Sequence, residues 1–208
     1  FLDETNPDLL SHLEKFRDNR DNRNQKMYIK LQEAGFPVTE EALRAMFPDA
    51  VLTRAHIARF LLEHGYIKTI SEAFEKYIGD GCRCYVAREK ITPQESIGLI
   101  HAAGGAAVLA HPILYHMSDA RLRELISDCK SCGLDGIEAI YSTYQRGEEQ
   151  YIRRLAKEYD LKLSGGSDFH GENKPYIHLG TGKGNLRIPD SILDAIKAEK
   201  ERVSQKSL

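Results

Sequence analysis

The chain has 208 residues, which is enough for one sizeable domain or for one domain that carries a smaller insertion. It is 41% hydrophobic and 29% charged, and its 29 Lys and Arg against 31 Asp and Glu give a formal net charge of -2. This balance argues against bulk electrostatic binding of nucleic acid. The sequence has no apolar run long enough to predict a membrane span. Together these features predict a cytoplasmic protein.

The first part of the chain, residues 1–80, is predicted to form a small all-helical subdomain. A long polar helix is expected over residues 8–34. Thr39 and Thr53 are expected to cap a second and a third helix, because a threonine side chain can accept a hydrogen bond from the free N–H groups of the first turn. A fourth helix is expected over residues 71–78.

The second part, residues 81–208, alternates between strand and helix patterns. Strands are predicted at residues 82–86, 106–110, 136–141, 162–165 and 179–182, and helices at residues 92–103, 119–132, 145–159 and 189–198. Strands separated by helices of this length imply βα units with right-handed crossovers. These units are too few to close an eight-stranded barrel, so the sequence predicts an α/β fold that forms part of one.

Metal-binding side chains follow two of the predicted strands. His111 comes directly after residues 106–110, and Asp168 and His170 come after residues 162–165. Functional residues of βα units gather where strands end, and an Asp-x-His pair on an extended segment points both side chains the same way. Each motif alone is more often an ordinary loop. Their occurrence together favours a site for zinc, manganese or iron.

The four cysteines form two close pairs. Cys82 and Cys84 lie in a predicted strand, and Cys129 and Cys132 lie in a predicted helix. Two such pairs could hold a zinc ion with four thiolates. We favour the alternative, in which they are small buried residues, and disulfides are still less expected in a cytosolic protein.

Three motifs, taken in order, resemble the last metal-ligand motifs of the PHP (polymerase and histidinol phosphatase) superfamily. They are GGAAVLAHP at residues 104–112, GIE at residues 136–138 and GGSDFHG at residues 165–171. LTRAHIAR at residues 52–59 and the Tyr85-Val86 pair resemble the insertion of its small-phosphoesterase branch. That branch cleaves phosphate monoesters of nucleotide-like substrates, nucleoside bisphosphates included.

The resemblance implies a distorted, TIM-like β/α barrel with up to three divalent metal ions (manganese, zinc or iron), of which this chain is the C-terminal part with a helical insertion. His111 would bind one metal, and Asp168 and His170 would serve the others. A metal-activated hydroxide would attack the phosphorus atom of a small phosphorylated substrate. Glu138 would orient a ligand through a hydrogen bond.

The resemblance also implies three substrate-binding residues. Arg54 and His56 resemble a pair that faces the active site in this branch, and Arg54 would hold a phosphate through its guanidinium group. Lys90 is a further candidate for a phosphate contact. The alternative is a solvated Arg54 and a packed His56.

The chain departs from the family at its beginning. It opens on Phe1 rather than Met, and none of its eight histidines forms the family's His-x-His motif. Three ligands cannot fill a multinuclear site, so we expect that the sequence is incomplete or that another polypeptide supplies the first half. The rival functions are a non-catalytic PHP-like binding or regulatory module and a metal-dependent amidohydrolase.

Overall fold

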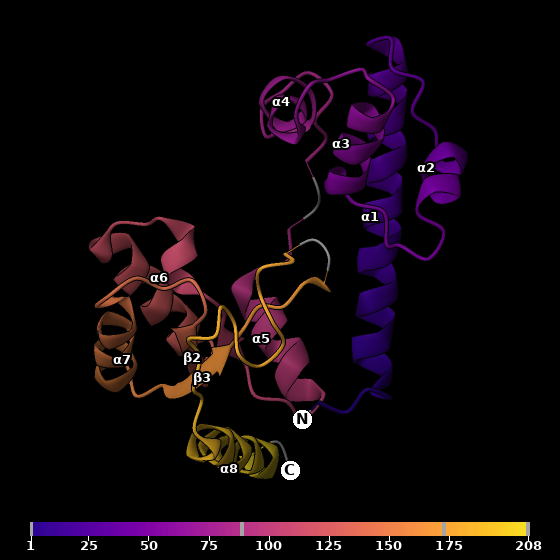
Figure 1. Ribbon diagram of the computed structural model, residues 1–208. Helices are drawn as coiled ribbons and strands as arrows, with labels where there is room; N and C mark the ends of the chain where they lie inside the picture. The colour runs from indigo at the N-terminus through magenta and orange to yellow at the C-terminus, as the bar shows by residue number, and fades with distance from the viewer. Residues whose placement is uncertain (1, 88–89, 172–173, 207–208) are drawn as a thin grey trace. The chain divides into compact units, whose positions relative to one another are not determined.

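The chain folds into two compact units (Figure 1). The computed structural model describes residues 2–87, 90–171 and 174–206, and the side chains as far as residue 201. Unit 1 comprises Phe1–Leu10 and Ile91–Leu208, and unit 2 comprises Ser11–Lys90. The sequence predicted the division at residues 80 and 81. In the structure the first residues belong with unit 1, where the Asp3 N–H donates to the Ala103 carbonyl (2.7 Å).

Unit 2 is helical, as predicted. Its elements are α1 (Pro7–Glu33, which begins in unit 1), α2 (Glu40–Met46), α3 (Arg54–Glu63), α4 (Ile70–Ala73) and a π-helical turn (Phe74–Ile78). Thr39 caps α2 as expected, since its hydroxyl accepts from the Ala42 N–H (3.1 Å). The core is made of fully buried side chains from successive helices, among them Met27, Leu31, Leu43, Ile57, Leu61 and Ile78. Each such side chain contributes about 1.5–3 kcal/mol of burial free energy.

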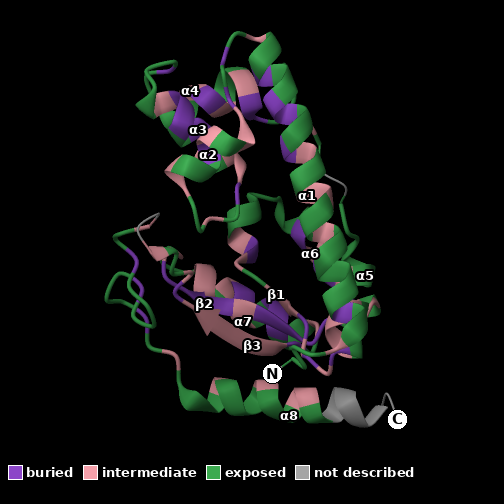
Figure 2. Ribbon diagram, turned by 90° about the vertical axis from the view of Figure 1, so that its right-hand side faces the viewer, coloured by how far each residue is buried: buried purple, intermediate pink, exposed green. Residues whose placement is uncertain are grey.

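Unit 1 is built on a parallel sheet of three strands in the order β1 (Val108–Leu109), β2 (Gly136–Tyr141) and β3 (Lys162–Gly166). The remaining elements are α5 (Pro93–Ala102), the 3-10 turn Pro112–Tyr115, α6 (Asp119–Ser131), α7 (Glu148–Glu158) and α8 (Asp190–Lys206). Helix α7 packs on β2 and α8 packs on β3. Figure 2 shows buried residues along β2 and mostly exposed residues along the described part of α8, residues 190–201.

Hydrophobic residues from both kinds of element form the core of unit 1. Ile137 and Ala139 of β2 are fully buried against Ile126 of α6 and against Ile152 and Leu155 of α7. Because alternate strand residues point to the same face, Ile137 and Ala139 present one apolar face to these helices. The two helices are also joined at the surface, where Arg123 donates to Glu158 (2.6 Å).

A buried carboxylate fixes the amino end of the sheet. Asp135 is 6% exposed and directly precedes β2. One of its carboxylate oxygens accepts from the Ala107 N–H (2.7 Å) and lies 2.7 Å from His101 Nε2. Its backbone N–H donates to the Ala107 carbonyl (3.0 Å), and its carbonyl accepts from the Lys162 N–H (2.9 Å). This one residue therefore joins α5 and the entrances of all three strands.

Two predicted strands are absent from the described residues, and a third is shorter than predicted. Residues 82–84 form a bend and a turn, in which the Cys84 N–H donates to the Tyr77 carbonyl (2.9 Å), and residues 85–86 have no regular secondary structure. Residues 179–182 form a loop closed by a bridge between His178 and Gly182, because Gly180 and Gly182 turn the chain with positive φ. Only Val108–Leu109 of the strand predicted at 106–110 pairs. The sheet thus shows three parallel strands, and a partial barrel is not confirmed.

Two further predictions concern the cysteines and a membrane-spanning segment. All four cysteines are free, which agrees with the expectation that no disulfide forms. Among the described residues, no helix combines the length and the apolar character needed to cross a membrane.

We predict that Asp135→Ala destabilises unit 1 by about 2–4 kcal/mol, because it leaves the buried Ala107 N–H and the His101 imidazole without their charged acceptor. Urea denaturation followed by circular dichroism measures the loss. Asp128→Ala, which removes an exposed carboxylate on α6, is the matched control and should change stability by less than about 0.5 kcal/mol. Equal effects of the two substitutions would contradict the role given to Asp135.

Candidate functional site

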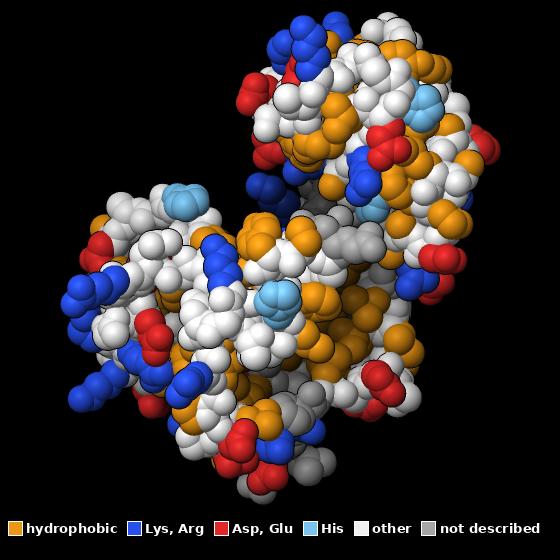
Figure 3. Space-filling view, viewed as in Figure 1, with side chains coloured by type: hydrophobic (Ala, Val, Ile, Leu, Met, Phe, Trp, Pro, Cys, Tyr) orange, Lys and Arg blue, Asp and Glu red, His pale blue; other side chains and the backbone are white. Residues whose placement is uncertain are grey.

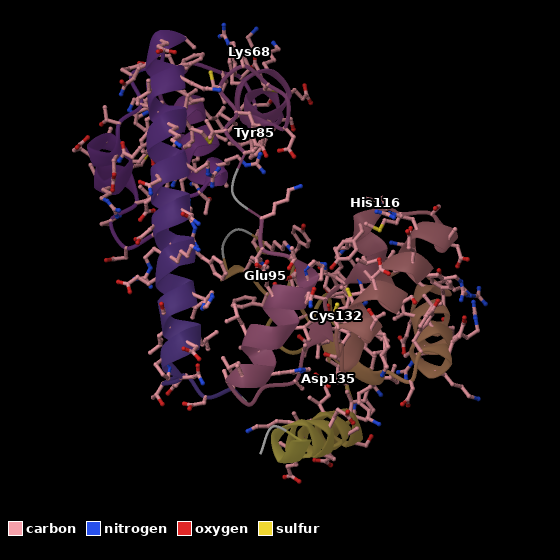
Figure 4. The ribbon with its side chains drawn as sticks, turned by 180° about the vertical axis from the view of Figure 1, so that it is seen from behind. Lys68, Tyr85, Glu95, His116, Cys132 and Asp135 are labelled. Atoms are coloured by element: carbon pink, nitrogen blue, oxygen red, sulfur yellow. The ribbon has the colours of Figure 1, made fainter. Side chains whose placement is uncertain are left out.

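The candidate site lies at the carboxyl ends of the three parallel strands. His111 follows β1, Glu138 lies in β2, and Asp168 follows β3. Parallel strands bring their carboxyl ends to the same edge of a sheet, where βα folds place their ligands. Figure 4 labels Asp135, which directly precedes β2, and His116, which ends the turn Pro112–Tyr115; the two residues lie on opposite sides of unit 1 in that view.

His111 is held in an uncommon backbone conformation. Its φ is 32°, in the left-handed region, and it directly precedes Pro112. Its backbone N–H donates to Glu138 Oε2 (2.8 Å). Its Nδ1 is buried and has no hydrogen-bond partner among the described residues. A buried imidazole nitrogen without a hydrogen-bond partner costs free energy. A bound metal ion would supply the missing partner.

Glu138 lies between His111 and β3. Adding a Cβ at Gly166 would bring it 2.9 Å from Glu138 Oε1, so this glycine leaves room for the carboxylate. Burial raises the pKa of Glu138, and the charge of Asp168 acts in the same direction, while the hydrogen bond from the His111 N–H opposes them. A half-buried carboxylate with a raised pKa beside a second acid is a candidate for a functional site.

Asp168 is held by hydrogen bonds on one carboxylate oxygen. Tyr141 OH donates to its Oδ2 (2.6 Å), and Lys174 Nζ lies 2.5 Å from the same atom. Burial opposes ionisation, but these hydrogen bonds from Lys174 and Tyr141 outweigh it and keep the pKa of Asp168 below its ordinary value. Asp168 also has a positive φ of 56°, and strained residues of this kind gather at functional sites.

His170 is exposed, and its ring is turned back toward Asp168. Its Nδ1 lies 2.8 Å from the Asp168 carbonyl oxygen and 3.4 Å from Asp168 Oδ1. The two side chains are thus in contact, but the segment is not extended as predicted, because β3 ends at Gly166 and Asp168 has a positive φ. Next to it, a hollow of about 180 Å³ is lined by Tyr141, Asp168, Lys174 and their neighbours.

A shift of strand register shapes this edge of the sheet. Glu138 pairs with Ser164, but Ile140 pairs with Gly165, so Ala139 is an extra residue on β2. The shift places Tyr141 opposite Gly166, and such bulges commonly re-aim side chains next to active sites. The rings of His111 and Tyr141 lie 5.6 Å apart, so Tyr141 is the side chain that connects His111 to Asp168.

The donor types fit a divalent cation, but the set is partial. His111 offers a buried nitrogen, and Glu138, Asp168 and His170 offer two carboxylates and an imidazole. Among the residues that the structure describes, however, no group of three or more His, Cys, Asp or Glu side chains is close enough to hold a metal. The four-thiolate zinc site is absent from the same residues. The described residues therefore do not bring His111, Asp168 and His170 together as one ligand set, and a metal site built on these three residues stays a prediction.

The predicted substrate-binding residues belong to unit 2, where two of them have structural contacts. Arg54 donates to Asp80 Oδ1 (2.9 Å), and its guanidinium lies over the Phe74 and Tyr85 rings. His56 Nδ1 accepts from the Thr53 N–H (3.1 Å), which closes a capping box at the start of α3. Lys90 is exposed. His56 is partly buried, and its role in substrate binding stays a prediction.

Two members of the site escaped the sequence analysis. Tyr141 is the last residue of a predicted strand, and its position at the carboxyl end was a usable signal. Lys174 lies six residues beyond Asp168 in a loop without a periodic pattern, so only the fold reveals its contact with the carboxylate.

The chain is similar to curated proteins over most of its length. It is 37% identical over 192 residues to a 5'-3' exoribonuclease of Haemophilus influenzae, a match that covers 92% of this chain and 68% of that protein. It is 31% identical over 170 residues to a 3',5'-nucleoside bisphosphate phosphatase of Chromobacterium violaceum, which covers 81% of this chain and 60% of that protein. The chain therefore spans about three fifths to two thirds of these relatives. No family model matches it.

Solved structures share the fold. A structure described as a metal-dependent phosphoesterase from Bifidobacterium adolescentis superposes with a TM-score of 0.76 at 27% identity and covers 95% of this chain and 68% of the other. An amidohydrolase structure from Chromobacterium violaceum, with bound sulfate and no metal, gives 0.77 at 28% identity and covers 95% and 69%. The motifs, the strand-end site and these similarities agree. The chain belongs to the PHP superfamily of metal-dependent phosphoesterases.

Proposed function

We propose that the complete protein is a metal-dependent phosphoesterase that hydrolyses a phosphate ester of a small nucleotide-like substrate. The observation that carries the proposal is the buried, unpartnered Nδ1 of His111, at the same sheet edge as the carboxylates of Glu138 and Asp168. The names of the relatives, a nucleoside bisphosphate phosphatase and an exoribonuclease, support the choice of a nucleotide-like substrate.

In this proposal His111, Asp168 and His170 hold divalent cations, up to three of manganese, zinc or iron as the resemblance implies. When bound, such cations supply hydroxide from water at neutral pH and neutralise charge on the phosphoryl oxygens. Glu138 positions His111 through the backbone hydrogen bond. Lys174 neutralises Asp168 in the absence of a cation, so a bound cation has to share or displace it.

The remaining ligands would come from outside these 208 residues, either from another part of the same protein or from another polypeptide. The three parallel strands would then be part of a distorted β/α barrel, and the helices of residues 1–80 an insertion in it. Arg54, His56 and Lys90 keep their proposed role as substrate contacts, with Arg54 exchanging Asp80 for phosphate. A cytoplasmic location and the absence of bulk nucleic-acid binding stay predictions.

Two observations favour rival functions, and one assay separates the three. The amidohydrolase name of a structural neighbour favours C–N hydrolysis, and the partial ligand set favours a non-catalytic binding module. The full-length protein, loaded with manganese, is tested with a generic aryl phosphate and with an aryl amide. Phosphatase activity that chelation abolishes and manganese restores supports the proposal. Amidase activity alone, or no activity at all, contradicts it.

We predict that His111→Asn lowers the phosphatase kcat of the manganese-loaded full-length protein at least about 100-fold, because the imidazole nitrogen proposed to bind the metal is lost. Asparagine is chosen because it tolerates the left-handed backbone at this position. Activity assays and elemental analysis of bound metal measure the effect.

The matched control for this test is His116→Asn. His116 is exposed five residues further on and also has a positive φ (51°), so the same substitution there should leave kcat within about twofold. If both variants lose activity equally, the loss reflects the loop and not a metal ligand.

We predict that Glu138→Gln makes the metal-free chain more stable at pH 7 than the wild type, with little difference at pH 4. Because burial raises the pKa of Glu138, the folded wild type keeps the proton to a higher pH than the unfolded chain does. Wild-type stability therefore falls as the pH rises from the ordinary glutamate pKa through the raised one, whereas glutamine has no proton to lose. Thermal melts at both pH values test this, and a gain at pH 4 as large as that at pH 7 would refute it.

A further inference from the structure

A second hollow adjoins the candidate site on unit 1. Its volume is about 390 Å³, and it is lined by the end of β2, the start of α7 and the loop of residues 185–187. Tyr141 is a lining residue of both this hollow and the one beside Asp168, so the two hollows are neighbours. Tyr144 lies next to Tyr141, with the two ring centroids 5.1 Å apart. The wall toward the metal site is therefore aromatic.

Two arginines without partners line this hollow. Neither Arg146 nor Arg187 makes a hydrogen bond or an ion pair with any residue that the structure describes. Other arginines of unit 1 do have partners: Arg121 with Glu124, Arg123 with Asp119 and Glu158, and Arg153 with Glu149. Figure 3 shows several Lys and Arg side chains on the face of unit 1 that carries α7.

The other residues that line the hollow do not neutralise the positive charge of Arg146 and Arg187. Glu149 is the acidic residue of the lining, and Arg153 Nε, 2.8 Å from its Oε1, already neutralises it. Gln145, Gln150 and Asn185 add neutral amides. Two guanidinium groups with five N–H donors each, amides and a tyrosine make a surface that is suited to a phosphate group.

The loop that carries Arg187 is fixed to the strand end. Asn185 Nδ2 donates to the Ser142 carbonyl (3.1 Å), and the buried Leu186 donates its N–H to the Thr181 carbonyl (3.2 Å). An added Cβ at Gly182 would lie 2.7 Å from Ser142 Cβ, so only glycine permits this close approach. Because the loop is held in place, less entropy is lost when Arg187 binds an anion.

We propose that this hollow is a second phosphate subsite, which binds through Arg146 and Arg187 a phosphate other than the one hydrolysed beside Asp168. The inference rests on the proposed function, since it assigns two phosphates to one substrate. Two sources carry that chemistry: the second phosphate of a nucleoside bisphosphate and the backbone phosphate next to the 5' end of an RNA strand. In both cases Tyr141 lies between the two phosphates.

Direct binding is tested first, without any activity. In the full ¹⁵N-labelled chain, inorganic phosphate is titrated at constant ionic strength against potassium chloride, and the Nε–Hε signals of the arginines are followed by NMR. We expect the signals of Arg146 and Arg187 to shift together and to saturate with phosphate, and Arg187→Gln to weaken the binding seen at Arg146 at least about fivefold. Shifts that match those of Arg121, or that chloride reproduces, would overturn the proposal.

Kinetics of the manganese-loaded full-length protein then identify the source of the phosphate. The substrates are an aryl phosphate, a nucleoside 3',5'-bisphosphate and a 5'-phosphorylated oligoribonucleotide. We expect Arg146→Gln and Arg187→Gln to raise KM about tenfold for the bisphosphate, the oligonucleotide or both, and to leave the aryl phosphate within about twofold. Arg121→Gln, which removes a paired surface arginine, should change none of them.

The two proposals fail in different ways. Turnover of all three substrates with unchanged KM in both variants and a flat phosphate titration rejects the subsite and leaves the phosphoesterase function standing. A saturable titration in a protein that hydrolyses none of the substrates supports phosphate binding at the arginine pair and rejects the phosphoesterase function.

Discussion

The carboxylate of Asp135 is the contact on which the geometry of unit 1 depends. It is buried at the amino end of β2, where it accepts from the backbone that leads into β1 and pairs with His101 of α5, while its own carbonyl accepts from the start of β3. These bonds set the register of all three strands at one end. The register in turn decides which residues emerge at the other end, because a slip of one residue would turn each side chain to the opposite face.

Residues with strained backbone conformations lie at the carboxyl end of the sheet, and the contacts at the amino end help to hold the sheet that carries them. His111 and Asp168 both have positive φ, and Glu138 is half-buried with its pKa raised by burial and by the charge of Asp168. Such features cost free energy and persist when the surrounding structure holds them in place. In unit 1 that structure is a short sheet packed against α7 and α8. A cation bound at this edge would relieve the repulsion between the two carboxylates.

The sequence predicted the elements that have a strong pattern and missed what depends on distant contacts. The helices and the strands β2 and β3 follow from apolar periodicity and capping residues. The positions of His111, Asp168 and His170 could be read because each follows a predicted strand. The strand predicted at residues 82–86 was wrong, since residues 82–84 form a bend and a turn in which the Cys84 N–H donates to the Tyr77 carbonyl instead of to a neighbouring strand. The contacts of Lys174 and Asp135 were out of reach, because each is fixed by a fold that brings remote segments together.

The hydroxyl that Tyr141 donates to Asp168 has a spectroscopic consequence. These 208 residues contain ten tyrosines and no tryptophan, so tyrosine dominates the fluorescence of this chain. A phenol that shares its proton with a carboxylate emits weakly, and Tyr141 makes this contact at 2.6 Å. A cation that binds Asp168 and breaks this hydrogen bond would increase the fluorescence of Tyr141. If the proposed site binds a cation, the tyrosine fluorescence of this chain would report it without an added label.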